Sequence, residues 1–142
     1  GETLSLAAAL ATMTKLQQVP VLETMKKQGQ KVLTGLRDLI LKHKVDHIVS
    51  ATGLPVWSFL LIKDIPPYSQ WDIKTLFLQE MFARGILTLG THNMSYSHSD
   101  SDLHRLFAVY DEVLPILRDA VENAALAKYL RCKPLVPLFR VR

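Results

Sequence analysis

Apolar residues recur at a spacing of three and four over about six helical turns in the C-terminal half of the chain. They are Leu103, Leu106, Phe107, Tyr110, Val113, Leu114, Leu117, Val121 and Ala124. This pattern predicts one long amphipathic helix whose apolar stripe faces a core. Ser99 and Asp102 have the spacing of a capping box and predict where the helix begins. Pro115 is expected to bend the helix, because its ring removes a donor and crowds a preceding carbonyl.

Two further helices are predicted at the N-terminal end. Thr3–Gln18 is rich in alanine and leucine and contains no glycine or proline. Its apolar residues surround nearly the whole cylinder, so this helix should be buried on all sides. A terminal helix of so short a chain is hard to bury within the chain, and we expect residues 1–18 to dock on a missing domain or partner subunit. After Pro20, Val21–His43 has a single apolar stripe and is predicted to be an ordinary surface helix.

The hydrophobic period changes from helical to alternating in the middle of the chain, which indicates strands. His47–Ala51 and Leu54–Ile62 are predicted to be strands joined around Thr52-Gly53 as an antiparallel pair. Ile86–Gly90 is predicted to be a third strand, and Met94–Ser97 is a candidate for a fourth.

A loop and another helix are predicted between these strands. Asp64–Gln70 contains a pair of adjacent prolines and must be a loop, because each proline lacks a donor. Ser69 is the predicted N-cap of a helix over Trp71–Arg84 that ends at Gly85. Together these elements predict a compact α+β domain with one polar loop between its last strand and its last helix.

Composition limits the class of protein. With 142 residues and 49% hydrophobic content, the chain has the size of one domain and can form a packed core. The net charge of +4 comes from basic residues that are interleaved with acids, which argues against a nucleic-acid partner. No apolar run approaches the roughly 20 residues of a membrane span, so no membrane partner is expected. The N-terminal run lacks the basic leader of a signal peptide, and the single Cys132 excludes an internal disulfide, so we expect a cytoplasmic protein.

The densest polar chemistry lies in Ile86–Tyr110, which contains three of the five histidines. If the chain contacts a small molecule, this loop is the predicted site. His92, His98 and His104 are six residues apart, with no acid placed to orient their rings, and this spacing matches no standard metal site. His98 is instead expected to form loop and cap hydrogen bonds. The common motifs of metal, nucleotide and hydrolase sites do not occur in the sequence.

Four segments of the chain resemble one enzyme family. The N-terminal segment reads GETLSLAAALAT and is similar to the start of the C-terminal small domain of class III pyridoxal-phosphate-dependent aminotransferases. The pair Gly53-Leu54, FLQEMFARGILTL at Phe77–Leu89 and SYSHSDSDLHRL at Ser95–Leu106 follow in the family's order and spacing. The last of these resembles the SxAHTxEDIDRL segment of glutamate-1-semialdehyde aminomutase, and the terminal PLFRVR resembles tails of that subgroup.

This resemblance implies a fold, and it implies different roles for a small and a large domain. The fold is the small domain of fold-type-I enzymes, an α+β domain with a three- to four-stranded, mostly antiparallel sheet. Helices cover one side of that sheet, and the other side packs on a large domain. The lysine that binds pyridoxal phosphate and the other cofactor-binding residues belong to the large domain, which would precede residue 1. No catalytic residue is therefore expected in residues 1–142. Lys15, Lys63 and Lys74 lie in contexts unlike that of the family's lysine and are interpreted as solvated.

The resemblance also implies roles for particular positions. The residues nearest the cofactor phosphate would be Gly1, Glu2 and Thr3, although Glu2 stands where the family has asparagine. The loop that faces the substrate would contain His92, Asn93, Ser95, Ser97 and His98.

The parent protein is expected to be a homodimeric transaminase or aminomutase that uses pyridoxal phosphate and a small amino substrate. The isolated chain should be inactive and should bind no cofactor. Residues 129–142, like residues 1–18, are expected to dock on the missing large domain or a partner subunit. The competing hypothesis is a stand-alone, non-catalytic α+β interaction domain, and the reading frame upstream of Gly1 distinguishes the two.

Overall fold

The computed structural model describes residues 2–137 and contains, within that range, five helices and one three-stranded sheet. In chain order the elements are α1 (Thr3–Gln18), α2 (Val21–Lys42), β1 (Val49–Leu54), β2 (Trp57–Ile62), α3 (Gln70–Ala83), β3 (Thr91–Asn93), α4 (Asp100–Glu122) and α5 (Leu126–Tyr129). The strands are antiparallel and lie in the order β1-β2-β3. The predicted α+β class with a three-stranded antiparallel sheet is confirmed.

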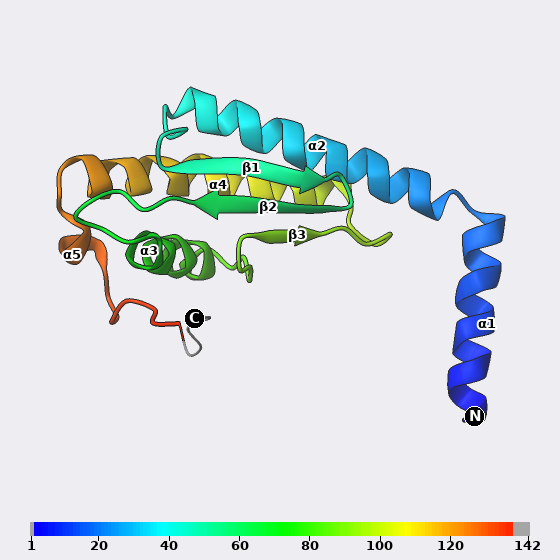
Figure 1. The fold of residues 1–142 in the computed structure, drawn as a ribbon. Helices are drawn as coiled ribbons and strands as arrows, with labels where there is room; N and C mark the ends of the chain where they lie inside the picture. The colour runs from blue at the N-terminus through cyan, green and yellow to red at the C-terminus, as the bar shows by residue number, and fades with distance from the viewer. Residues whose placement is uncertain (1, 138–142) are drawn as a thin grey trace.

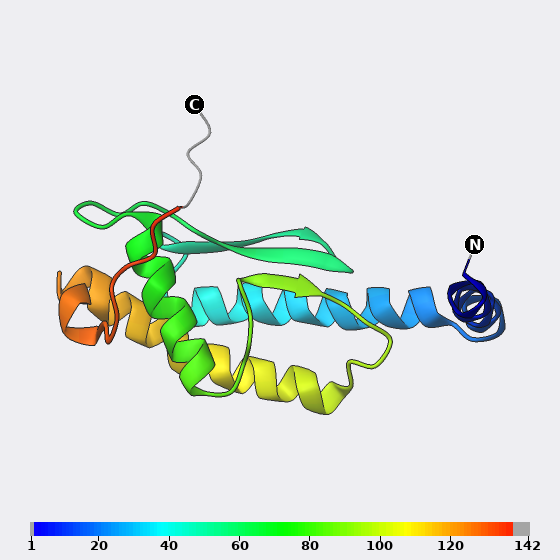
Figure 2. The ribbon, with the colours of Figure 1, turned by 90° about the horizontal axis from the view of Figure 1, so that it is seen from below.

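The helices lie on one side of the sheet. Figure 2 shows α2 and α4 next to each other beneath the strands, while no described helix covers the opposite face. In Figure 1, α3 is seen nearly along its axis, so it runs across the direction of the strands. This arrangement leaves one sheet face open, which we call the open face.

One core lies between the sheet and the helices. Val49 of β1 and Leu60 of β2 face this core, because alternate residues of a strand point to the same side. Phe77 of α3 and Tyr110 of α4 are fully buried there, and their rings stack with centroids 6.1 Å apart. Burial of this apolar area is the main force that holds α2, α3 and α4 against the strands.

Helix α2 crosses the turn between β1 and β2 at very close range. A Cβ atom at Gly29 would overlap the carbonyl oxygen of Pro55, so only glycine fits at this crossing. Further along the same helix, a Cβ at Gly35 would meet the ring of Phe107 from α4 at 2.7 Å. The two glycines therefore bring α2 close to its neighbours on either side.

The predicted turn between the first two strands is wrong. β1 continues through Thr52 and Gly53, and the chain turns instead at Pro55-Val56, with Leu54 opposite Trp57. Gly53 has a φ of +106° and remains paired with Ser58, so glycine here relieves strain inside the strand. Pro55 lacks the donor that a continuing ladder would need, and it therefore belongs to the turn.

The predicted third strand over Ile86–Gly90 is also wrong, because β3 contains only Thr91–Asn93. Gly85 and Gly90 have positive φ angles of 79° and 86°, which interrupt an extended chain at both ends of the segment. The Gly90 N–H donates to Thr88 Oγ1 at 3.0 Å and closes a short turn. Sheet pairing starts at the Gly90 carbonyl, which accepts a hydrogen bond of 2.8 Å from the Leu60 N–H.

The candidate fourth strand over Met94–Ser97 does not form. The Met94 N–H donates to the Val56 carbonyl at 3.0 Å, and the chain then turns so that the His98 N–H donates to the Ser95 carbonyl at 3.2 Å. The serines and the histidine of this segment bond to one another instead of to a neighbouring strand.

The four long helices were all predicted, and each predicted end lies within one residue of the observed end. Ser69 and Ser99 are the N-caps of α3 and α4, and each forms a capping box with an aspartate three residues later. Helix α4 continues through Pro115. These boundaries were predictable because capping boxes and glycine stops act through local sequence alone.

Helix α1 stands away from the rest of the molecule. Figure 1 shows it projecting from the N-terminal end of α2, and none of its residues is buried. Leu4 is 75% exposed and Leu10 is 64% exposed. The described chain therefore does not bury this apolar helix. Docking of residues 1–18 on another domain or subunit stays a prediction.

The segment after α5 follows α3. The Leu135 N–H donates to Thr75 Oγ1 at 2.8 Å, and the Arg131 N–H donates to Gln79 Oε1 at 2.6 Å. Val136 remains 72% exposed. Residues 129–135 thus contact the chain's own helix, whereas residues 138–142 of the predicted docking tail lie outside the described residues.

Candidate functional site

Strand β3 separates the residues of the predicted loop onto two faces of the sheet. His92 lies opposite Ser58 and faces the core, whereas Asn93 lies opposite Trp57 on the open face. Thr91 is paired with Phe59 and shares the open face with Asn93. Because successive strand residues point to opposite sides, a ligand on the open face would meet Thr91 and Asn93 and not the ring of His92.

The imidazole of His92 is held between two hydroxyl groups. Its Nδ1 lies 3.1 Å from Ser58 Oγ of β2, and its Nε2 lies 2.8 Å from the Tyr110 hydroxyl of α4. Burial lowers the pKa of His92 to about 4, although its hydrogen bond with the Ser58 backbone raises it. Burial also raises the pKa of Tyr110. At neutral pH both groups are therefore uncharged and form a buried chain of hydrogen bonds.

The turn after β3 is fixed by its own side chains. His98 Nδ1 accepts a hydrogen bond of 3.0 Å from the Ser95 N–H, and the hydroxyls of Ser95 and Ser97 lie 2.9 Å apart. Ser99 then caps α4, and its backbone N–H and hydroxyl both donate to Asp102, which lowers the pKa of that carboxyl group. His98 was expected to make loop and cap hydrogen bonds, and its bond with the Ser95 N–H is a hydrogen bond within the loop.

A cavity of about 530 Å³ opens beside this turn at the edge strand β3, and Thr91, His92 and Asn93 all line it. Its polar lining includes Thr88, Asn93, His98, Asp102 and Arg105. The Thr88 hydroxyl accepts a backbone N–H, so its own hydrogen is free to donate. Because His98 Nδ1 is occupied, the Nε2 of the neutral ring carries the hydrogen. The volume lies in the range of small-molecule sites, which is about 300–1,000 Å³.

The open face carries large apolar side chains with no cover in the described part of the chain. Trp57 is 53% exposed and its ring centroid lies 5.1 Å from that of Phe59. Leu54 and Leu61 are exposed beside them. A hollow of about 390 Å³ lies next to this surface, lined by Leu87, Thr88, Leu89, Thr91 and Asn93. Polar Asn93 and Thr91 therefore border an apolar surface of the kind that usually contacts another protein body.

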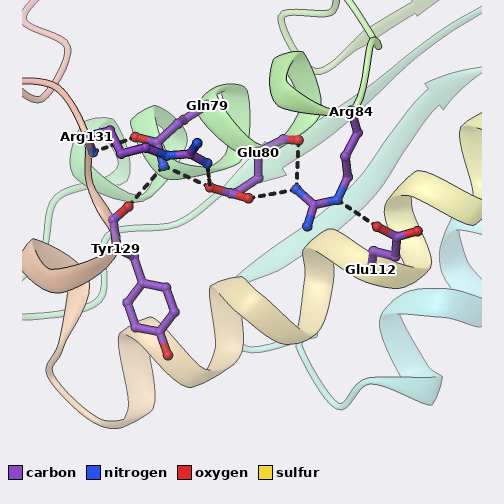
Figure 3. A network of polar contacts seen from close by, with 6 residues as sticks. All are labelled: Gln79, Glu80, Arg84, Glu112, Tyr129 and Arg131. Atoms are coloured by element: carbon purple, nitrogen blue, oxygen red, sulfur yellow. Dashed lines mark hydrogen bonds and ion pairs between the residues drawn. The ribbon is translucent and has the colours of Figure 1, made fainter.

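A second polar cluster, which the sequence did not reveal, joins α3, α4 and the segment after α5 (Figure 3). Glu80 is buried, and its two carboxylate oxygens each lie 2.7 Å from a guanidinium nitrogen, one of Arg84 and one of Arg131. Arg84 also pairs with Glu112 at 2.7 Å. Burial raises the pKa of Glu80, but hydrogen bonds from Gln79, Arg84 and Arg131 outweigh it and hold the pKa at about 2.

The positions assigned to the cofactor phosphate lie far from these features in the sequence. Glu2 caps α1 by accepting hydrogen bonds of 2.9 Å from the N–H groups of Leu4 and Ser5. The Ser5 hydroxyl donates to the same carboxylate and, together with these N–H groups, lowers the pKa of Glu2. Thr3 is the first residue of α1 and is exposed. Gly1 lies outside the described residues. The role of Glu2 in this structure is that of an N-cap.

The three lysines singled out in the sequence all lie at the surface. Lys63 donates to the Asp46 carbonyl at 2.8 Å, while Lys15 and Lys74 lie over the rings of Tyr96 and Trp71. None of the three is buried. The structure therefore surrounds none of them with the apolar environment that activates a lysine amine.

The three histidines of the polar loop lie in different environments. His92 is buried, His98 is half-buried and His104 is exposed, so the three side chains have different environments. Within residues 2–137, no group of three or more histidine, cysteine, aspartate or glutamate side chains could hold a metal ion. Over the same range, no helix combines the length and the apolarity needed to cross a bilayer.

The fold of this chain is similar to that of part of a solved protein. No family model matches the chain. The fold is similar to that of the FumI protein of Sphingopyxis sp. MTA144 in its PLP internal aldimine form, with a TM-score of 0.60 and 24% sequence identity. The chain has the fold of part of that protein. The match covers 80% of this chain but only 27% of FumI, so the chain spans about a quarter of that protein's length.

The match to FumI supports the α+β architecture and extends no further than the fold at this level of identity. Two residues of the site were missed in the sequence, namely Ser58 and Tyr110. Ser58 occupies a core-facing position in an otherwise apolar strand, and Tyr110 lies in the apolar stripe of α4. A buried serine and a buried tyrosine both need a partner, and this requirement was the available signal.

Proposed function

We propose that this chain is the C-terminal small domain of a pyridoxal-phosphate-dependent aminotransferase or aminomutase of class III, similar to glutamate-1-semialdehyde aminomutase. The fold shared with part of FumI, a protein seen with PLP, is the observation that carries the proposal. The ordered resemblance of four sequence segments supports it independently. The whole protein's reaction, its amino substrate and its homodimeric state are parts of this proposal.

In this proposal, the described residues do not hold pyridoxal phosphate by themselves. Pyridoxal phosphate supplies an electron sink for reactions at an amine-bearing carbon, and it needs a lysine, a carboxylate at the pyridine nitrogen and phosphate donors. Lys15, Lys63 and Lys74 are at the surface, and the buried carboxylate of Glu80 is already bound by two guanidinium groups. In the proposed parent protein, these components come from the large domain.

This chain would contribute the wall that closes over the substrate. The open face carries Trp57, Phe59 and Leu61, which would pack on the large domain and exclude water from the site. Asn93 and Thr91 project from the same face, so they are the polar residues of the predicted loop that a substrate beyond the sheet would meet. Ser95, Ser97 and His98 would hold the turn in position for closure.

The proposal is tested by trapping the cofactor on lysine. The chain alone and the product of the complete reading frame are each mixed with equimolar pyridoxal phosphate, reduced with borohydride and mapped by mass spectrometry. We expect scattered, low-level labelling of the chain and one fully labelled lysine, outside residues 1–142, in the longer product. A single dominant labelled lysine within the chain would overturn the division between the two domains.

The exposed apolar surfaces also favour a second candidate, a non-catalytic interaction domain. The open face and α1 would serve any protein partner equally well. The same reading frame distinguishes the candidates, because a start codon near Gly1 and a product without trapped cofactor would support the interaction domain.

A further inference from the structure

The shortest strand of the sheet depends on one buried side chain. β3 has only three residues, and it pairs with β2 alone among the described strands. So short an edge strand has few backbone hydrogen bonds to hold it in register. His92 lies at its centre and is the residue of β3 that reaches the core.

We propose that His92 is a positioning residue, which ties β3 to β2 through Ser58 and to α4 through Tyr110 and so fixes Asn93 and Thr91 on the open face. This inference deepens the proposed function. The placement of Asn93 and Thr91 toward a substrate rests on that function, whereas the anchor does not. The anchor itself rests on the two contacts of 3.1 Å and 2.8 Å and on the burial of all three side chains.

Both partners of the His92 ring are hydroxyl groups, and each hydroxyl can donate or accept. In either tautomer of the neutral ring, one ring nitrogen donates, the other accepts, and both contacts are kept. Burial lowers the pKa of His92 and so favours the neutral ring at neutral pH.

A positioning role and a proton-transfer role make different demands. His92 lines the cavity beside the turn, but proton transfer to a substrate there would need a free ring nitrogen, and both nitrogens are occupied by the hydroxyls of Ser58 and Tyr110. Asn93 and Thr91 lie on the other face of the same strand. Loss of the anchor should therefore move these two residues without removing an acid or a base from the reaction.

The first test measures the anchor in the chain itself. Nitrogen NMR of the His92 ring should show a neutral imidazole at neutral pH. Tyr110→Phe keeps the ring packing but removes the donor, and we expect amide exchange of Leu60 and of β3 to accelerate about tenfold or more. Tyr129→Phe removes a hydroxyl from a half-exposed tyrosine in α5 and should leave β3 unchanged. If Tyr110→Phe does not fold, Ser58→Ala is the second variant, because it removes the hydroxyl contact at Nδ1.

Unchanged exchange in both variants would overturn the anchor. The second test uses the product of the complete reading frame. If it has aminotransferase activity, Tyr110→Phe and Asn93→Ala should both raise KM several-fold while the pH profile of kcat keeps its shape. A profile that loses one limb in Tyr110→Phe would assign proton transfer to the buried chain. If no activity is found, the proposed function fails, whereas the exchange results still decide the anchor.

Discussion

At the scale of single residues, Gly29 shows how a small side chain controls the architecture. The residue lies where α2 crosses the carbonyl of Pro55, and backbone atoms cannot move aside as a flexible side chain can. Alanine would normally favour a helix by about 1 kcal/mol over glycine. The overlap reverses this preference and makes Gly29 a requirement of the fold.

We predict that Gly29→Ala lowers the free energy of unfolding by about 2 kcal/mol or more, because α2 must shift away from the β1–β2 turn. Gly35→Ala on the same helix is the matched control, since its new methyl meets only the ring of Phe107, which can rotate or shift. Urea denaturation measures both. The overlap at Pro55 would be refuted by equal effects of the two substitutions or by a more stable Gly29→Ala variant.

His98 leads to a second prediction at this scale. Its replacement by alanine leaves the Ser95 N–H without an acceptor, which should cost about 1 kcal/mol and speed amide exchange at Ser95. In the complete protein we expect the same change to affect loop closure and substrate affinity. His98→Asn is the control, because its side-chain oxygen can still accept. A variant with normal stability and affinity but no proton transfer would make His98 an acid or a base.

At the scale of elements, the Glu80 cluster connects the segment after α5 to α3 and α4 (Figure 3). The folded-state pKa of Glu80 is about 2, below the 4.5 of a free glutamate. A group with a depressed pKa stabilises the fold fully above its unfolded value, and this contribution is lost as pH falls through the folded value. The contribution of the Glu80 charge to the free energy of unfolding is therefore lost as the pH falls from 4.5 to about 2.

We predict that Glu80→Gln lowers the unfolding free energy by about 1–2 kcal/mol at neutral pH, a value reduced for solvent screening of the exposed Arg131. The difference from the unsubstituted chain should disappear as the pH approaches the folded pKa of about 2. Glu112→Gln, whose side chain is 60% exposed, is the control and should cost less than half as much. A difference that persists at low pH would show that Glu80 acts by packing and not by charge.

The sequence predicted the helices far better than the strands, for physical reasons visible in particular residues. Ser69 and Ser99 fix helix starts through bonds to residues three positions away, so the signal is local. The alternating pattern around Gly53 is compatible with two turn positions, and the choice of Pro55-Val56 depends on contact with α2 at Gly29. Strand position is thus decided by tertiary contacts.

The sequence predicted which segment contains the candidate site, but not which of its residues lie on each face of the sheet. The polar loop does contain His92, Asn93 and His98, yet which of them reach the core depends on the start of β3 at Thr91. A shift of one residue exchanges the two faces of a strand. The predicted strand over Ile86–Gly90 misplaced that start, and the partners Ser58 and Tyr110 were therefore not connected with His92.

At the scale of the whole molecule, the uncovered apolar surfaces dominate its expected behaviour in solution. Helix α1 has no buried residue, and Trp57, Leu54 and Leu61 are exposed on the open face. A patch of this kind gains free energy whenever a second surface removes it from water.

We predict that the isolated chain self-associates through these surfaces, with a sedimentation coefficient that rises with concentration. Leu6→Glu with Leu10→Glu should reduce association by placing charge on α1, whereas Leu41→Glu, an exposed position on α2, is the matched control. A strictly monomeric chain at high concentration, with α1 ordered against its own core, would contradict this prediction.

The alternation along β3 has a consequence for how such a protein can change over evolutionary time. Positions 91 and 93 face outward and can be varied with little effect on folding, while positions 58, 92 and 110 are constrained by one another. A randomised library at 91 and 93 should therefore retain most of its members as folded proteins. One at 92 should lose most of them. The strand thus allows new specificities to be sampled on one face while the other face preserves the fold.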